Sequence, residues 1–251
     1  MKLNFSRVLL AGTVGLVAIV ATSSLAEEFS RRALGQVVRA CSIAQSTLGV
    51  SFPCTEVRPG EADDDGYVVI RSPGFASEFL VAPIAPISGI ESPTLRTNAA
   101  TDLWQAAWDT RTDVAAALGR HLPRDAVGLA VNAEGTRTQD HFHIHIDCLQ
   151  PSVSDALARY APRITQHWTK LPVALRGDVY WVRAIDSPDL AGVNVARLID
   201  DAPPATDNLT GHATVAVAGA TLPDGKQGFY LLANWRDSSA ERLLDHNCSV
   251  G

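Results

Sequence analysis

Apolar and polar residues alternate most regularly over residues 141–148, whose sequence is HFHIHIDC. Successive side chains of a strand point to opposite faces, so this alternation predicts a strand with one buried apolar face. The polar residues would share the other face, with same-face neighbours about 6.5–7 Å apart: His141, His143, His145 and Asp147. The pattern therefore predicts that three imidazoles line a surface or a cleft.

Similar patterns predict the other elements. Short runs rich in β-branched and aromatic residues indicate strands at residues 67–71, 78–84, 126–135, 178–185, 212–221 and 228–235. Helices are expected at residues 29–49, 101–119, 152–164 and 240–246, the second from apolar steps of three and four and the third from a capping box at Ser152–Asp155. Turns at Pro73-Gly74 and Asp224-Gly225 would close two hairpins. Helices and largely antiparallel strands in this order predict an α+β fold.

The first 26 residues differ from the rest of the chain. Lys2 and Arg7 precede an uncharged apolar run at residues 8–21, and Ser24-Leu25-Ala26 has the small-x-small form that signal peptidase accepts. We therefore expect residues 1–26 to be a signal peptide or an N-terminal membrane anchor, with the following chain exported. Residues 27–251 contain no low-complexity linker and no internal repeat, and are predicted to form a single domain.

Export changes the interpretation of the four cysteines, which all follow Ala26 and match no zinc-binding spacing. We expect Cys41 to pair with Cys54 across a short turn-rich loop. Cys148 and Cys248 would then tie the C-terminus to the histidine strand. Free buried thiols are the alternative.

The overall charge excludes one class of partner. The chain has a formal net charge of −6 and 19% charged residues. This composition is globular but offers no basic excess for a nucleic-acid backbone, so no nucleic acid is expected to bind.

The three alternating histidines allow two kinds of chemistry. His-x-His on a strand can ligate zinc. Alternatively, one imidazole attacks phosphorus while its neighbours supply protons and positive charge, because an imidazole with a pKa near 6.5 is largely neutral at pH 7. The spacing alone leaves both possibilities open.

The sequence HFHIHID resembles the pattern of the histidine triad (HIT) superfamily of nucleotide hydrolases and transferases, and VNAEG resembles the strand that precedes the triad there. More specifically, the chain resembles the bacterial CDP-diacylglycerol pyrophosphatase family. The similarity runs from the first cysteine pair through GYVVI, ISGIESP, LWQAAWDTR, LAVNAEGTRTQDHFHIHIDCLQPSV and ALRGDVYWVR to DHNC. This resemblance implies a HIT-like, mainly antiparallel sheet flanked by helices, with extra C-terminal strands. It also implies hydrolysis of CDP-diacylglycerol to CMP and phosphatidate at the periplasmic face of the inner membrane, without metal or cofactor.

The resemblance also implies roles for individual residues. His143 matches the nucleophile, His145 the histidine that assists the leaving group, and His141 the one that orients the site. Asn132 matches a polar residue that contacts the nucleotide or the backbone of the triad. The chain departs from the superfamily pattern upstream of the first histidine, where Arg137 and Thr138 replace Gln and Ser.

Three further polar residues of this region have alternative interpretations. Arg137 could grip the diphosphate or lie exposed in a loop, and Gln139 could hydrogen-bond a phosphate. Asp147 could orient His145, but a solvated position at the strand end is favoured.

Residues elsewhere are interpreted more simply. Trp104 and Trp108 share one side of a helix, where core packing is favoured over a wall for an acyl chain. Arg176 could contact the second phosphate or be a solvated turn residue, and the Glu91–Pro93 segment could border the site. No role is assigned to the scattered histidines: His121, His167, His212 and His246.

Two other functions compete with the histidine nucleophile. The same histidines could serve a zinc-dependent hydrolase, or the chain could be a periplasmic nucleotide- or lipid-binding protein without turnover. The oligomeric state is left open, because the extra C-terminal strands could complete the sheet within one subunit.

Overall fold

The computed structural model describes residues 28–60, 66–97, 101–203 and 210–249. Its centre is one sheet in which every pairing is antiparallel, in the order β1-β2-β3-β5-β4-β8-β9-β7-β6, while β10 pairs with β5. The strands are β1 (Glu56–Arg58), β2 (Tyr67–Arg71), β3 (Phe79–Pro83), β4 (Val127–Val131), β5 (Ile144–Leu149), β6 (Thr169–Leu175), β7 (Asp178–Ile185), β8 (Thr214–Thr221), β9 (Gln227–Asn234) and β10 (Leu244–Asp245). The α+β prediction is confirmed.

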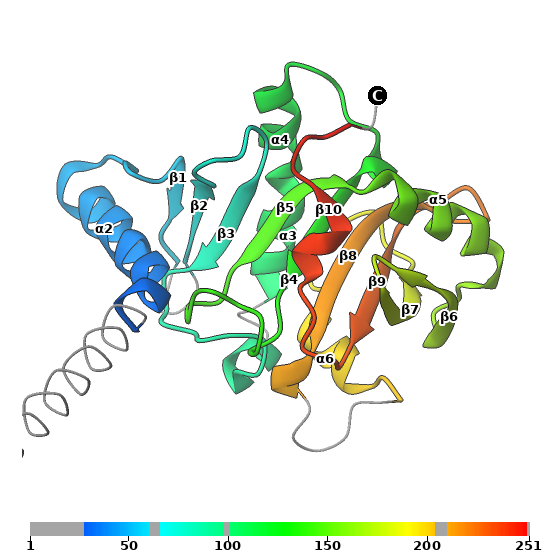
Figure 1. The fold of residues 1–251 in the computed structure, drawn as a ribbon. Coiled ribbons are helices and arrows are strands. Elements are labelled where there is room, and N and C mark those ends of the chain that lie inside the picture. The colour runs from blue at the N-terminus through cyan, green and yellow to red at the C-terminus, as the bar shows by residue number, and fades with distance from the viewer. Residues whose placement is uncertain (1–27, 61–65, 98–100, 204–209, 250–251) are drawn as a thin grey trace, which may run out of the picture.

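The helices lie on both faces of the sheet and at its ends (Figure 1). The α-helices are α2 (Ala33–Leu48), α3 (Thr101–Asp109), α4 (Arg111–Leu118), α5 (Pro151–Tyr160) and α6 (Val195–Asp200). Short 3-10 helices are η1 (Pro93–Arg96), η3 (Arg124–Ala126), η4 (Ala161–Arg163), η5 (Thr210–His212) and η6 (Ala240–Leu243).

One face of the sheet is covered by α3, α4 and α6 and holds the largest cluster of buried apolar residues. The apolar face of β5 belongs to this core, as the alternation predicts: Phe142, Ile144, Ile146 and Cys148. Trp104 and Trp108 are buried in the same cluster, and Trp108 packs edge-on against Phe229. The favoured core role of both tryptophans is therefore confirmed.

The opposite face is covered in two separate places. The helix α2 packs Leu34 and Val38 on β1–β3, and α5 and η6 pack around Leu149 and Leu232. Figure 1 shows α2 and α5 at opposite ends of this face, with the C-terminal segment η6–β10 between them. The histidine side of β5 lies between these two coverings.

The structure corrects three predicted helices. The helix expected at residues 101–119 is interrupted at Thr110, whose hydroxyl donates to the carbonyl oxygen of Ala106 at 2.8 Å, and α3 and α4 result. The capping box at Ser152 is wrong, because α5 begins at Pro151 after Gln150, and Gln150 makes no side-chain cap. Proline suits this first helical position, where no amide hydrogen is needed. The segment expected as a helix at residues 240–246 is instead η6 followed by β10.

Three elements were not predicted: β1, β6 and α6. β6 contains Pro172, which argues against a central strand. It is tolerated because β6 lies at the edge of the sheet, where its register with β7 also shifts between Lys170 and Ala174.

Both predicted disulfides form. Cys41 on α2 bonds to Cys54, and Cys148 on β5 bonds to Cys248. The second bond fastens the C-terminal segment to the strand that carries the histidines.

The predicted signal peptide or anchor at residues 1–26 lies outside the described residues. Among the helices that are described, none is long and apolar enough to cross a membrane.

Candidate active site

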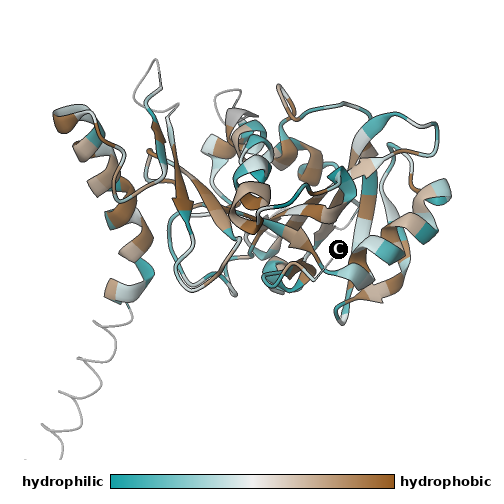
Figure 2. Ribbon diagram, turned by 90° about the horizontal axis from the view of Figure 1, so that it is seen from above, coloured by the Kyte–Doolittle hydropathy of each residue, from teal (hydrophilic) through white to brown (hydrophobic). Residues whose placement is uncertain are grey.

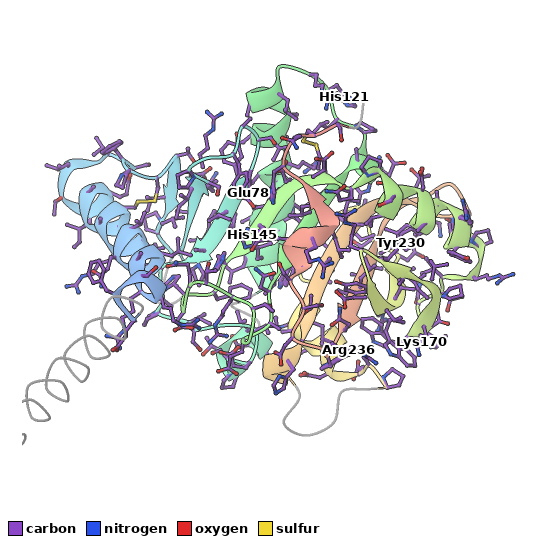
Figure 3. The ribbon with its side chains drawn as sticks, viewed as in Figure 1. Glu78, His121, His145, Lys170, Tyr230 and Arg236 are labelled. Carbon is purple, nitrogen blue, oxygen red and sulfur yellow. A yellow bond between two sulfur atoms is a disulfide. The ribbon has the colours of Figure 1, made fainter. Side chains whose placement is uncertain are left out.

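The candidate active site lies on the polar side of β5, where side chains from three distant parts of the chain meet. His145 is opposite Leu80 of β3, so Glu78, two residues earlier, extends toward it along the same face. Figure 3 shows Glu78 and His145 side by side over the middle of the sheet. Glu241 of η6 completes the group at 3.0 Å from His145 Nε2.

His143 lies just before β5 and is buried as a neutral base. Its Nδ1 is 2.7 Å from the carbonyl oxygen of His141. A carbonyl can only accept, so Nδ1 carries the proton and Nε2 keeps its lone pair. Burial, assisted by the positive charge of His145, lowers the pKa of His143 to about 3. This ring is therefore an unprotonated base at neutral pH.

His145 has the opposite character. Its Nδ1 donates to Glu78 Oε1 at 2.9 Å. Burial opposes the charged ring, but the carboxylates of Glu241 and Glu78 outweigh that cost and raise the pKa of His145 to about 9. The rings of His143 and His145 meet edge to face with centroids 4.7 Å apart. A permanent imidazolium thus adjoins the neutral base.

The second nitrogen of His145 has a special position. Nε2 is close enough to Glu241 for an ion pair, but its N–H does not point at that oxygen, and among the described residues it has no hydrogen-bond acceptor. Buried polar groups usually have partners. A substrate oxygen that accepted from this N–H would share it with the Glu241 carboxylate.

Asn132 holds Glu241 in place. Its amide nitrogen donates to Glu241 Oε1, and its Oδ1 accepts from Ala240 N at 2.8 Å and Ser239 Oγ at 3.2 Å. Burial would raise the pKa of Glu241, but the contacts with His145 and Asn132 lower it to about 2. Asn132 acts on the site by positioning this carboxylate beside His145.

His141 stands apart from the other two rings. Its Nε2 donates to the carbonyl oxygen of Pro83 at 2.8 Å, and burial lowers its pKa. The ring packs against Gly35 of α2, where an added Cβ would lie 3.3 Å from His141 Nδ1. His141 therefore joins α2 to the histidine strand, in agreement with an orienting role.

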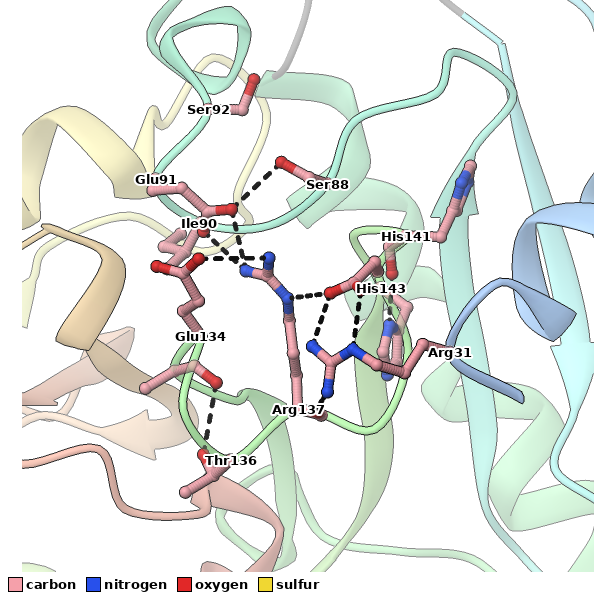
Figure 4. Close-up of polar contacts among 12 residues, drawn as sticks. Arg31, Ser88, Ile90, Glu91, Ser92, Glu134, Thr136, Arg137, His141 and His143 are labelled. Carbon is pink, nitrogen blue, oxygen red and sulfur yellow. Dashed lines mark hydrogen bonds and ion pairs between the residues drawn. The ribbon is translucent and has the colours of Figure 1, made fainter. Parts of the chain in front are cut away.

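Arg137 is buried, so its expected alternative as an exposed loop residue is wrong. Its Nη1 donates to both carboxylate oxygens of Glu91 at 2.8 Å, and its Nε donates to Asp140 at 3.0 Å (Figure 4). Arg31 also pairs with Asp140 at 2.7 Å. Glu91 therefore borders the site, and the guanidinium is held in a fixed orientation.

The four residues Asn132, Arg137, His141 and His143 line one small hollow with Ser88 and Gly89. Gln139 does not line it. Its Oε1 accepts from the backbone N–H of Leu34 at 2.8 Å, which fastens the start of α2. The predicted phosphate contact of Gln139 stays a prediction.

Asp147 is fully buried, so the favoured prediction of a solvated carboxylate is wrong. It accepts from Ser77 Oγ at 2.8 Å and from His246 Nδ1 at 2.9 Å, so its carboxylate is directed at these groups. The hydrogen bond to Asp147 raises the pKa of His246. His246 also lies 3.6 Å from Glu78, so a residue that was given no role adjoins the site.

Sequence reasoning missed Glu78, Glu241 and His246. Glu78 is the first residue of the strand predicted at residues 78–84, and this position was the only indication that it could lie near the site. Nothing in the local sequence pattern indicates a role for Glu241. Arg176 lies in the turn between β6 and β7, where its carbonyl oxygen accepts from Arg242 at 2.7 Å. It is not among the residues that line the hollow.

The zinc alternative requires imidazoles that converge on one point. Instead, His141 Nε2 and His143 Nδ1 bond to different carbonyl oxygens. Among the described residues, the only cluster of free ligands around a triad histidine is Glu78, His145 and Glu241, and the other cluster contains the disulfide-bonded cysteines. Because both nitrogens of His145 face carboxylates, the cluster of Glu78, His145 and Glu241 favours a protonated imidazole.

The fold is α+β, and the paired imidazoles are its candidate active site. The comparison with known families identifies the class of protein. A model of the family "CDP-diacylglycerol pyrophosphatase" matches residues 29–251, and the chain belongs to this family. A Yersinia pestis protein named CDP-diacylglycerol pyrophosphatase is 36% identical over 204 residues, which cover 79% of this chain and 76% of that protein. Membership of the histidine triad superfamily stays a prediction.

Proposed function

We propose that the chain hydrolyses the diphosphate bond of CDP-diacylglycerol to CMP and phosphatidate through a transient cytidylyl-histidine. Family membership and the name of the Yersinia relative support the substrate. The observation that carries the mechanism is the neutral ring of His143 against the charged ring of His145.

In the first step, His143 Nε2 attacks the phosphorus next to the cytidine. The new N–P bond forms as the bond from this phosphorus to the bridging oxygen breaks, and phosphatidate leaves with that electron pair. His143 Nδ1 keeps its proton, and the carbonyl oxygen of His141 stabilises the positive charge that develops on the ring.

His145 stabilises the leaving group mainly by its charge. Phosphatidate is a phosphomonoester whose second pKa is near 6, whereas the pKa of His145 is about 9. Full proton transfer would be uphill by about 3 units, or roughly 4 kcal/mol. The Nε2–H of His145, which lies 3.0 Å from Glu241 Oε1 without a hydrogen bond to it, instead donates to the bridging oxygen while the proton stays on the ring.

In the second step, water attacks the phosphorus of the intermediate. Its oxygen bonds to phosphorus and the N–P bond breaks; one water proton goes to solvent, and the other stays on the new phosphate oxygen until CMP ionises. CMP leaves, and His143 returns to the neutral form with its proton on Nδ1. One water molecule is consumed in each cycle.

The surrounding residues take positioning and binding roles. Arg137, which lines the hollow beside His143, is proposed to contact the diphosphate through Nη2, which lies 4.0 Å from Glu134 Oε1. Asn132 keeps Glu241 beside His145. His141 holds the segment that carries the histidines against the end of β3 through its hydrogen bond to Pro83.

The reaction is proposed to need no metal and no cofactor. It is proposed to occur at the periplasmic face of the inner membrane, because residues 1–26 have the form of an export signal or anchor and the substrate is a lipid.

The test is the release of CMP and phosphatidate from CDP-diacylglycerol. The unsubstituted chain should produce both, and His143→Ala should lower kcat by at least about 10³-fold because it removes the nucleophile. His167→Ala, at an exposed position, is the matched control and should keep full activity. Turnover that survives His143→Ala unchanged, or no CMP release by the unsubstituted chain, would reject the proposal.

A further inference from the structure

Exposed apolar side chains are concentrated at one end of the molecule. Seven large apolar residues are exposed among the described residues, and five lie between residues 29 and 52. Phe29, Leu48 and Phe52 are 76%, 74% and 79% exposed, and Ile43 and Val50 accompany them. Scattered apolar residues need no explanation, but a cluster of this kind marks an interaction surface.

The helix α2 presents this surface away from the sheet. Its buried residues Leu34, Val38 and Cys41 occupy one side. At 100° per residue, Arg39 and Ile43 fall on the other side of the helix. Figure 2 shows α2 at one end of the molecule, with hydrophobic residues reaching its outer end.

Further exposed apolar residues lie at the C-terminal end of α2, where Leu48 is on the same side of the helix as Cys41, and in the loop that follows. Leu48 ends the helix, Val50 and Phe52 follow, and the disulfide from Cys41 to Cys54 fastens this loop back to the helix. The apolar side chains are thereby held at a fixed position. We call Phe29, Ile43, Leu48, Val50 and Phe52 the α2 apolar surface.

The charge of this region suits an anionic partner. α2 contains no acidic residue, and its one charged side chain, Arg39, is exposed. Among the described residues, Arg39 has no ion-pair partner, whereas the neighbouring Arg31 and Arg32 pair with Asp140 and Glu28. The chain as a whole has a net charge of −6. Basic and apolar side chains on one helix face are typical of helices that lie in a bilayer interface.

A groove leads from this surface to the site. It has a volume of about 430 Å³ and lies along α2, with Arg32, Arg39 and Ile43 on one wall and Ile84 and Pro86 on the other. His141 lines this groove and also the small hollow beside His143. A lipid that enters beside α2 would therefore reach His141, the residue that the two spaces share.

The position of the chain end agrees with this orientation. In the sequence, the apolar run at residues 8–21 ends shortly before Glu28, where the described structure begins.

We propose that the α2 apolar surface docks on an anionic phospholipid bilayer and that the groove beside it admits the glycerol phosphate end of the lipid substrate. This inference rests on the proposed function for the identity of the substrate. The docking itself does not, because it follows from the exposure, the charge and the groove.

Docking is tested first without any reaction. The full chain with Phe52→Trp is reconstituted in vesicles of phosphatidylcholine and phosphatidylglycerol with brominated acyl chains, which quench tryptophans within the bilayer. Quenching should exceed that of the unsubstituted chain. The matched control is Val179→Trp, at an exposed apolar position on β7, which should add no quenching. Equal quenching at positions 52 and 179 would overturn the proposal.

A second experiment uses activity. Combined Leu48→Ser, Val50→Ser and Phe52→Ser should lower kcat/KM about tenfold for long-chain CDP-diacylglycerol in vesicles. It should leave kcat/KM unchanged for a short-chain analogue below its critical micelle concentration. Loss on both substrates or on neither would contradict docking. If the unsubstituted chain released no CMP from either substrate, the proposed function would fail, while the quenching result would still decide the docking.

Discussion

His143 and His145 are two positions apart in the chain, yet the pKa values of their rings lie near 3 and near 9. Burial and the neighbouring charge of His145 keep His143 neutral, against the effect of its hydrogen bond to the carbonyl oxygen of His141. His145 is equally buried but faces two carboxylates, so its charge is retained. The two residues are of the same type, so their different surroundings cause the different protonation states. Other sites separate the pKa values of neighbouring groups in the same way.

These pKa values predict the pH dependence of kcat/KM, which reports the free enzyme. Activity requires His143 unprotonated and His145 protonated. It should therefore stay level from about pH 5 to 8 and fall as the pH rises through about 9, where His145 loses its proton. Initial rates across this range check the profile. A bell centred near pH 6.5, as two unperturbed imidazoles would give, would contradict the account.

Glu241→Gln should show how His145 keeps its charge. Removing one carboxylate lowers the pKa of His145, so the alkaline fall of kcat/KM should move downward by about 1 unit. The rate at neutral pH should drop by about 10- to 100-fold because less charge faces the leaving group.

The matched control for Glu241→Gln is Asp155→Asn, at an exposed position on α5. It should leave the pH profile and the rate unchanged. A loss of activity in Glu241→Gln with an unmoved alkaline limb would mean that Glu241 acts through structure alone.

At the scale of elements, β5 is the strand on which the site depends. At His145 it is paired on both edges, by Leu80 of β3 and Ala130 of β4. β10 then extends the β3 edge, pairing with Cys148 and Leu149. The histidines therefore extend from a strand that cannot shift its register without breaking three pairings.

The two disulfides should stabilise the fold unequally. Cys41 and Cys54 are 13 residues apart, and Cys148 and Cys248 are 100 apart. In the chain-entropy model, removal should cost about 3 kcal/mol for the short loop and nearly 5 kcal/mol for the long one. Denaturant unfolding of the two double alanine variants measures this difference. An equal or larger loss in the Cys41/Cys54 variant would contradict the ranking.

The sequence predicted the elements whose side chains repeat with a clear period. The alternation at residues 141–148 placed the apolar side of β5 in the core, and the two hairpins formed as expected. The break at Thr110 was invisible, because apolar steps of three and four continue through it and the interruption comes from one hydroxyl bonding back to Ala106.

The candidate site was predictable only in part. The histidines could be identified from their alternating spacing and from their resemblance to the histidine triad pattern. The partners of His145 come from the start of β3 and from η6, which approach it only after the sheet has assembled. Single carboxylates carry no periodic signal, so neither Glu78 nor Glu241 could be assigned beforehand.

At the scale of the whole molecule, the site occupies the space that α2 and the C-terminal segment leave open over the sheet. Both coverings are fastened by disulfides, α2 through Cys41 and the C-terminal segment through Cys248. The groove along α2 gives this space an entrance from one end. The architecture thus separates a rigid histidine strand from a surface that can face lipid.

The account also predicts the response to metal removal. Prolonged chelation followed by dialysis should leave kcat/KM for CDP-diacylglycerol unchanged, because His143 acts as a nucleophile and His145 stays protonated. Zinc returned to the same sample should not raise the rate. Activity lost on chelation and restored by zinc would support the zinc-dependent alternative.

The most direct test is mass spectrometry of enzyme quenched during turnover of CDP-diacylglycerol. The account predicts a cytidylyl group on the peptide that contains residues 141–148, fragmented to His143, and no such group in His143→Ala. Under single-turnover conditions, a covalent group on another residue, or full CMP release without any modified peptide, would contradict the central claim that His143 bonds to phosphorus.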